Sequence, residues 1–257
     1  MQPIIIDTHT HLYDEQFDED RVQIVNKAIA AGVEKMLLPN CNSTTIDAMM
    51  SLHQAFPKHC LPMMGLHPVY VKEDYKQELE IVNQQLAQGN FVAVGEIGLD
   101  FYWDTSFKSA QIEAFEQQIV WALAYQLPIV IHTRDSIKEG IAIVRKYQQG
   151  NLKGVFHCFS GDAAEAKAII DLGFHLGIGG VLTFKNSGLK DFIHQLPLSS
   201  LLLETDAPYL APVPYRGKRN ESSYLPLVAQ FIAEKMNCTV QEIATQTTQN
   251  AKALFQL

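Results

Sequence analysis

Eight short apolar runs recur along the chain, and amphipathic stretches with helical spacing separate most of them. Because buried parallel strands read as near-continuous apolar runs, we expect strands at residues 4–6, 33–39, 61–66, 91–97, 128–132, 154–159, 175–180 and 201–205. Two further helical stretches, 224–236 and 240–255, end the chain. This alternation over 257 residues predicts an α/β fold, a (β/α)8 TIM barrel that forms one domain over residues 1–257. A doubly wound open sheet is the alternative, but no G-x-G-x-x-G loop follows the first run.

Charge and cysteine content limit the classes of partner. The formal net charge is −8 and 19% of the residues are charged, so the chain lacks a general attraction to nucleic acid and would need a local basic patch to bind it. The four cysteines are scattered, which argues against a disulfide framework and a thiolate zinc site. No apolar run approaches membrane-spanning length. We therefore expect a soluble, cytoplasmic protein with no membrane contact and no obligate protein partner.

Side chains that can bind metals interrupt the apolar runs at their carboxyl ends. His9 and His11 end the first run, and alternate side chains of a strand share a face, so both can point the same way. The other interruptions are His67, Glu96, His132, His157 and Asp206. Each one alone has an ordinary explanation, such as a hydrogen-bonded core histidine or a carboxylate in a salt bridge. Because a barrel gathers the carboxyl ends of its strands around one mouth, we interpret the set as a divalent-metal centre.

Motifs along the whole chain resemble those of the TatD family, metal-dependent hydrolases of the amidohydrolase superfamily. They are I-D-T-H-T-H (6–11), G-L-H-P (65–68), G-E-I-G-L-D (95–100), P-I-V-I-H-T-R (128–134), H-C-F-S-G (157–161), E-T-D-A-P-Y-L-A-P (204–212), Y-R-G-K-R-N (215–220) and N-A (250–251). The resemblance implies a TIM barrel and a deoxyribonuclease that trims single-stranded DNA from its 3′ end. No lysine ends a predicted strand at the mouth, which disfavours the lysine-bridged branch of the superfamily.

The resemblance also implies a ligand set for two divalent cations. His9, His11 and Asp206 would hold one ion, His132 and His157 the other, and Glu96 would bridge them. A bridging carboxylate suits two ions that clamp both oxygens of an in-line phosphoryl displacement, and one ion activates the attacking water. Asp206 is the candidate general base. Nitrogen-rich ligands favour zinc or manganese, whereas family members are treated as magnesium-dependent, so the metal stays open among Mg, Mn and Zn.

Substrate contacts are expected at the same mouth. His67 is expected to touch substrate phosphate or to assist the leaving group, and Arg134 should face the mouth because it follows His132 by two residues. Tyr102, within Phe101-Tyr102-Trp103, could stack on bases or could cap the top of the barrel. Three basic residues in the loop after the eighth strand are predicted phosphate contacts: Arg216, Lys218 and Arg219.

Residues beside the proposed ligands lead to further expectations. Asp100 is expected to orient a ligand histidine. Cys158 directly follows His157 on a predicted strand and should face away from it into packing, and no G-x-S-x-G elbow marks a serine nucleophile. Two positions depart from the family pattern: Tyr13 stands where relatives have Asp or Asn, and Ser222 replaces the proline of Asn-Glu-Pro. Neither is expected to touch a proposed ligand.

Two other functions stay open. One is hydrolysis of a small amide, ester or phosphoester, as in other members of the superfamily. The other is a metal-containing nucleic-acid-binding protein without turnover. Intact candidate ligands disfavour the second, and the acidic net charge disfavours general coating of nucleic acid.

Overall fold

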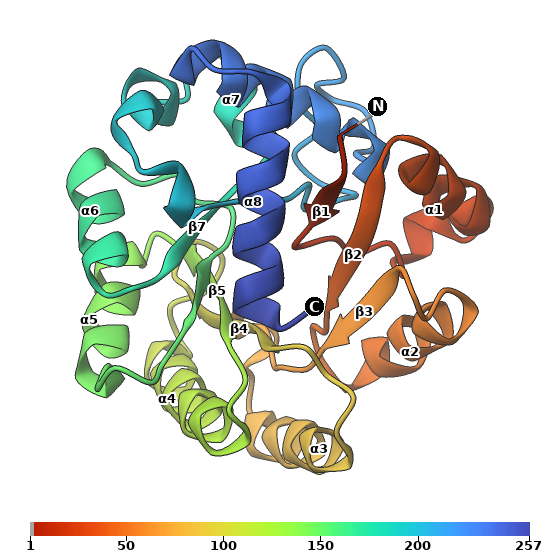
Figure 1. Cartoon of the computed structure of the whole chain (residues 1–257). Coiled ribbons are helices and arrows are strands. Elements are labelled where there is room, and N and C mark those ends of the chain that lie inside the picture. The colour runs from red at the N-terminus through yellow and green to blue at the C-terminus, as the bar shows by residue number, and fades with distance from the viewer. Residues whose placement is uncertain (1–2) are drawn as a thin grey trace.

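The computed structural model describes residues 3–257 and forms a ring of eight parallel strands surrounded by helices (Figure 1). The strands are β1 (Ile5–Asp7), β2 (Val33–Pro39), β3 (Cys60–Met63), β4 (Val94–Asp100), β5 (Ile129–Arg134), β6 (Gly154–Phe156), β7 (His175–Ile178) and β8 (Leu201–Leu203). The helices are α1 (Arg21–Ala30), α2 (Ile46–Ala55), α3 (Tyr75–Gln88), α4 (Lys108–Tyr125), α5 (Ile137–Tyr147), α6 (Ala163–Asp171), α7 (Leu225–Met236) and α8 (Val240–Phe255). The predicted (β/α)8 TIM barrel is confirmed.

Strand pairing follows the chain order. Strands β1 to β3 form one parallel sheet and β4 to β8 a second. A parallel bridge from Met64 to Val94 joins β3 to β4, and the Thr8 N–H donates to the Leu203 carbonyl (3.0 Å) between β1 and β8. Both seams are therefore closed, and the carboxyl ends of all eight strands surround one mouth.

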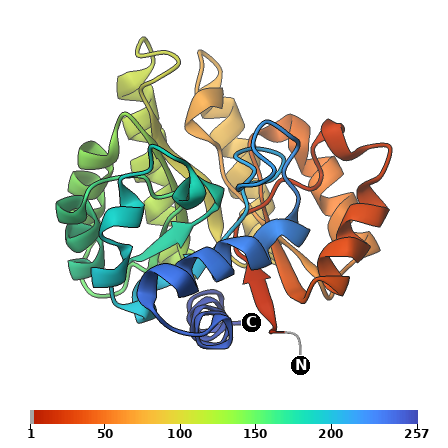
Figure 2. The same ribbon diagram turned by 90° about the horizontal axis from the view of Figure 1, so that it is seen from above.

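Apolar side chains fill the barrel and close the end at which the strands begin. Strand residues form one buried cluster with the carboxyl-terminal part of α8; its strand members include Ile6, Leu37, Val130, Val155 and Leu202. Helix α8 crosses the centre of the ring in Figure 1, and Figure 2 shows it at the edge where the N-terminus lies. Asn250 of α8 donates to the carbonyls of Leu198 and Leu201, at the start of β8. Helix α8 therefore closes this end of the barrel, and the carboxyl ends of the strands lie at the opposite end.

The outer layer follows from amphipathic sequence. Helix α6 begins with a capping box in which the Asp162 side chain and Glu165 bond each other's backbone N–H groups, and Thr239 and Glu242 do the same for α8. Short 3-10 helices occupy residues Glu15–Phe17, Ser43–Thr45, Pro68–Tyr70, Gly180–Thr183, Leu189–Asp191, Ile193–Gln195, Leu198–Ser200 and Ser222–Tyr224. Within residues 3–257, no helix is long and apolar enough to cross a membrane.

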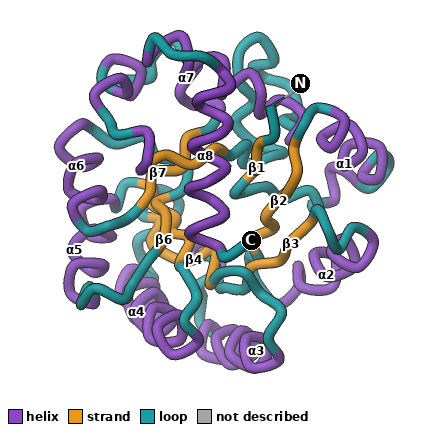
Figure 3. Tube along the Cα trace, in the orientation of Figure 1, coloured by secondary structure: helices purple, strands orange, loops and turns teal. Residues whose placement is uncertain are grey.

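The structure differs from the sequence predictions mainly at the mouth. Strand β1 ends at Asp7 and β6 at Phe156, so His9, His11 and His157 lie in the following loops and not on strands. Between β7 and β8 the chain forms successive 3-10 helices and no α-helix; Figure 3 shows these short helical segments between the two strands. Strand β4 lies three residues later than expected and continues to Asp100, which pairs with Arg134.

Candidate metal centre

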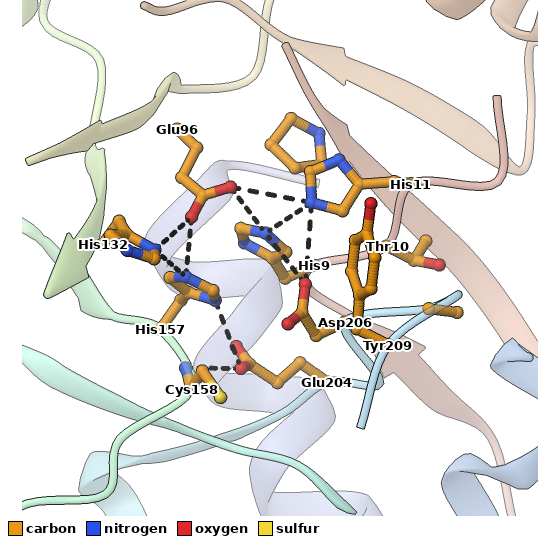
Figure 4. Close-up of polar contacts among 12 residues, drawn as sticks. His9, Thr10, His11, Glu96, His132, His157, Cys158, Glu204, Asp206 and Tyr209 are labelled. Atoms are coloured by element: carbon orange, nitrogen blue, oxygen red, sulfur yellow. Dashed lines mark hydrogen bonds and ion pairs between the residues drawn. The ribbon is translucent and has the colours of Figure 1, made fainter. Parts of the chain in front are cut away.

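The predicted metal ligands meet at the open end of the barrel (Figure 4). Glu96 and His132 lie within strands β4 and β5, and the other members follow the carboxyl ends of β1, β3, β6 and β8. Three overlapping groups could each hold an ion: His9, His11 and Asp206; His9, Glu96 and His157; and His67, Glu96 and His132. All are buried or half-buried. The structure thus brings together the six predicted ligands and also places His67 beside them.

Glu96 divides the cluster into two halves. Its Oε2 lies 3.1 Å from His9 Nε2 and 3.6 Å from His11 Nε2. Its Oε1 lies 2.9 Å from His132 Nδ1 and 2.7 Å from His157 Nε2. Asp206 Oδ1 is 3.7 Å from His9 Nε2 and 3.6 Å from His11 Nε2, so it belongs to the first half. Each carboxylate oxygen of Glu96 therefore faces one of the two predicted ion positions.

Hydrogen bonds on the outer side fix which nitrogen of His11 faces the cluster. The Tyr13 hydroxyl donates to the Pro39 carbonyl (2.5 Å) and lies 2.9 Å from His11 Nδ1. Since its proton is used, this hydroxyl accepts from Nδ1–H, and the lone pair of His11 is on Nε2. The expectation that Tyr13 touches no proposed ligand is therefore wrong. The contact between Tyr13 and His11 could not be predicted from their spacing of two residues, because both lie in the loop after β1.

Asp100 has the same relation to His132. Its Oδ2 lies 2.9 Å from His132 Nε2, the nitrogen opposite the one that faces Glu96. A carboxylate at this place holds a proton on Nε2 and leaves the Nδ1 lone pair toward the cluster. Asp100 therefore contacts His132, one of the proposed ligands, as predicted.

Glu204 is a member of the site that the sequence reasoning missed. It is fully buried, its Oε1 lies 3.5 Å from His157 Nδ1, and it accepts a hydrogen bond from the Cys158 N–H (2.5 Å). Gly177 makes room for it, because a Cβ there would lie 2.1 Å from Glu204 Oε2. The available signal was a charged residue directly after three leucines, since a buried carboxylate needs partners.

Cys158 was expected to face away from His157 into packing, but it lies at the cavity of the site. Its backbone has a φ of 46°, a left-handed conformation, and the half-buried residue lines the cavity that also contains His157. Strand alternation fails here because β6 has already ended at Phe156. Burial raises the pKa of the Cys158 thiol, with the carboxylates of Asp206 and Glu204 adding to the shift, so it is a thiol and not a reactive thiolate at neutral pH.

Electrostatics favour positive charge inside the cluster. Burial opposes ionisation of Glu96, but His157, His67 and His9 outweigh it and hold its pKa well below the usual range. Burial also opposes ionisation of Asp206, whose pKa is nevertheless lowered by the hydrogen bond of His11 and by nearby histidines. Within residues 3–257, no lysine or arginine pairs with either carboxylate. Their counter-charge must come from protonated histidines or from bound cations.

The donor set fits divalent cations. His9 Nε2 faces His11 Nε2 at 3.3 Å, and His132 Nδ1 faces His157 Nε2 at 3.3 Å. Since the outer nitrogens of His11 and His132 face Tyr13 and Asp100, the inner nitrogens of these two rings are the ones that offer lone pairs to a cation once the rings are neutral. Converging imidazole lone pairs and ionised carboxylates are the ligands of a transition-metal site.

His67 has a different chemistry from the other histidines. Its Nδ1 accepts a hydrogen bond from the Val69 N–H (3.1 Å), so the neutral ring carries its proton on Nε2, which lies 3.4 Å from Glu96 Oε1. Burial lowers the pKa of His67, with Glu96 opposing it and His132 adding to it. The ring is therefore a neutral N–H donor, suited to an oxygen of the substrate.

The cluster opens into a cavity of about 1010 Å³. Arg134 and Trp103 line this cavity, and Tyr102 and Arg134 line a neighbouring pocket of about 610 Å³. Arg134 therefore faces the mouth as predicted, and Tyr102 lies at its rim. Their contact with substrate stays a prediction.

The basic loop after β8 does not reach the site. Arg219 pairs with Asp20, donates to the Gln16 carbonyl, and lies over the Phe17 ring. Arg216 lies over the Phe184 ring, and Lys218 is exposed. None of these three basic side chains lines the cavity around the cluster. The ion pair with Asp20 leaves Arg219 less available to a phosphate than expected, and phosphate contact by Arg216 and Lys218 stays a prediction.

Comparison with known proteins supports one family. The sequence model described as "TatD related DNase" matches residues 6–256. The metal-dependent hydrolase YabD of Bacillus subtilis is 38% identical over 99% of this chain and 100% of the relative. The 3′-5′ ssDNA/RNA exonuclease TatD of Erwinia amylovora is 33% identical over 98% of this chain and 100% of its own length.

A solved structure agrees with these relatives. The crystal structure of YjjV, a TatD homologue from Escherichia coli K12, superposes with a TM-score of 0.94 at 30% identity, and the match covers 100% of both chains. The chain belongs to the TatD family of metal-dependent hydrolases.

Proposed function

We propose that the protein is an exonuclease that removes nucleotides from the 3′ end of single-stranded DNA at a centre of two divalent cations. The observation that carries the proposal is the division of one buried cluster by Glu96, with an oxygen toward each half. The TatD relative of Erwinia amylovora, named as an exonuclease of single-stranded DNA and RNA, supports the choice of substrate. The scattered cysteines support a cytoplasmic location as part of the proposal.

His9, His11 and Asp206 would hold one cation and His132 and His157 the other, with Glu96 shared between them. Two cations bound there would supply charge stabilisation for the phosphoryl group and an acidified water as nucleophile. Asp206 is ionised and accepts the proton of the attacking water. Its second carboxylate oxygen is not used in the contacts to His9 and His11 and is free to do so.

Two further side chains would hold the substrate. The Nε2–H of His67 donates to a non-bridging oxygen of the scissile phosphate, which its neutral state allows. Arg134 is exposed at the cavity wall and forms no ion pair with another residue in 3–257, so its guanidinium is available for the next phosphate. His67 acts on the reacting group, whereas Arg134 positions the strand.

The test is digestion of single-stranded DNA that carries a label at the 5′ or the 3′ end, in magnesium, manganese or zinc. We expect stepwise shortening from the 3′ end. Glu96→Gln should abolish it, because the amide cannot bridge two cations, while Glu234→Gln on the exposed face of α7 should behave like the wild type. Activity confined to small esters, amides or phosphoesters would contradict the proposal, as would nuclease activity that survives Glu96→Gln.

A further inference from the structure

Two large aromatic side chains are exposed at the rim of the cavity. Tyr102 is 53% exposed and Trp103 is 67% exposed. The preceding residue, Phe101, is half-buried and packs against the hydrophobic core, so it already caps this part of the barrel. Capping therefore explains Phe101 but not its two neighbours. Exposed aromatic side chains beside a cavity are typical of a ligand-binding surface.

Arg134 joins the two rings into one surface. Its guanidinium carbon lies 3.7 Å from the centroid of the Tyr102 ring and 5.2 Å from that of Trp103. The two rings meet edge to face, with centroids 4.9 Å apart and an interplanar angle of 88°. We call Tyr102, Trp103 and Arg134 the rim platform. Stacked guanidinium and aromatic groups are the partners on which unpaired bases stack.

One carboxylate connects the rim platform to the metal centre. Asp100 Oδ1 accepts hydrogen bonds from the backbone N–H groups of Tyr102 (3.0 Å) and Trp103 (3.3 Å), and its Oδ2 lies 2.9 Å from His132 Nε2. Gln111 of α4 holds the Asp100 backbone in turn, through its N–H (2.9 Å) and its carbonyl (3.1 Å). The position of the platform relative to the proposed ligand His132 is thus fixed by a single side chain.

We propose that the rim platform binds the base of the nucleotide next to the scissile phosphate and thereby selects unpaired strands. The inference rests on the proposed nuclease function. A base held in a duplex offers its faces to its stacked neighbours, so only an unpaired base can lie on Trp103 or against the platform. Arg134 adds a positive charge where the phosphate of that nucleotide must pass, and Asp100 keeps the base at a constant distance from the reacting group.

The first test compares cleavage of a short single-stranded oligonucleotide with cleavage of an oligonucleotide of equal length whose inner positions are abasic. Both carry the same phosphates, so the ratio of their kcat/KM values reports on the base alone. We expect the wild type to prefer the normal strand by about 5- to 150-fold, the range that corresponds to one aromatic–base stack. Trp103→Ala should lose most of this preference, and Trp103→Phe should restore it.

The matched control is Tyr125→Ala, an exposed aromatic residue at the end of α4 that should keep the preference. Cleavage of both strands at equal rates by the wild type, or an unchanged preference in Trp103→Ala, refutes the platform and leaves the nuclease function standing. If the wild type cleaves neither strand, the proposed function is refuted and the platform falls with it.

A second test reads the platform without catalysis. Trp103 and Trp121 are the only tryptophans, so Trp121→Phe leaves Trp103 as the single tryptophan fluorophore. With the metal-loaded protein and phosphorothioate-linked strands that resist cleavage, the normal oligonucleotide should quench the emission of Trp103, whereas the abasic oligonucleotide and blunt duplex DNA should not. Equal quenching by the abasic strand would show that the phosphates and not the bases approach Trp103, and would overturn the inference.

Discussion

Replacing Tyr13 with phenylalanine should weaken metal binding in one half of the centre. Tyr13 is 4% exposed, and its hydroxyl connects His11 Nδ1 (2.9 Å) to the Pro39 carbonyl (2.5 Å). The change removes only the oxygen, so the buried Nδ1–H and the carbonyl both lose their partner. The closest remaining acceptor for Nδ1–H is the Sγ of Cys41, at 3.8 Å, which is a weak one.

The size of the effect follows from the role of the partner. Loss of the group that orients a ligand histidine lowers metal affinity by about 10- to 100-fold, or about 1.4–2.7 kcal/mol. The unfolding free energy should also fall by about 1–3 kcal/mol, because buried polar groups are left unpaired. The fall in metal affinity distinguishes this role from simple packing, since the benzyl ring is retained.

The assay is calorimetric titration of metal-free protein with manganese or zinc. We expect Tyr13→Phe to weaken one binding event and to leave the other unchanged, since His132 and His157 have separate partners. Tyr209→Phe is the control, because that ring also meets His11 edge to face (6.2 Å) but its hydroxyl bonds no other residue of the described chain. Two unchanged binding constants in Tyr13→Phe would refute the argument that this hydroxyl orients His11.

Three further predictions follow from the site and its supports. Gly98 has a φ of 136°, and a Cβ there would lie 2.1 Å from the His132 carbonyl oxygen. Gly98→Ala should therefore lower the unfolding free energy, measured by urea denaturation, by about 3 kcal/mol or more. Gly188→Ala is the control, because a Cβ there meets open space, and it should change the unfolding free energy by less than about 1 kcal/mol. Arg134→Ala should reduce the salt dependence of single-strand binding by about one unit of log K against log[salt], and Arg219→Ala should not. Burial opposes protonation of His157, but Glu96 and Glu204 outweigh it and raise the pKa of His157 well above its usual value. Metal binding at pH 7 should therefore release a proton from His157. The calorimetric heat of binding should then depend on the ionisation enthalpy of the buffer.

The sequence predicted the barrel and the convergence of the candidate ligands for one reason. Parallel strands that alternate with helices have one mouth, so residues such as Glu96 and Asp206 meet there although 110 positions separate them. The set of candidate ligands could therefore be predicted from the positions of the strand ends, without knowledge of any contact between side chains.

Partners that depend on loop conformation could not be predicted in the same way. Tyr13 bonds to Pro39, and Arg219 pairs with Asp20, through loops whose conformation no sequence periodicity predicts. Cys158 lies at the cavity with a left-handed backbone, which no strand pattern indicates. The role of Glu204 needed the space that Gly177 leaves, and such a fit is a property of two elements packed together.

The most direct test of the two-cation centre is an anomalous difference map from crystals grown with manganese. The account predicts two peaks, one on the Oε2 side of Glu96 beside His9, His11 and Asp206, and one on the Oε1 side beside His132 and His157. Both peaks should be lost or reduced in crystals of Glu96→Gln. A single peak in the wild type, or two peaks that do not share Glu96, would contradict it.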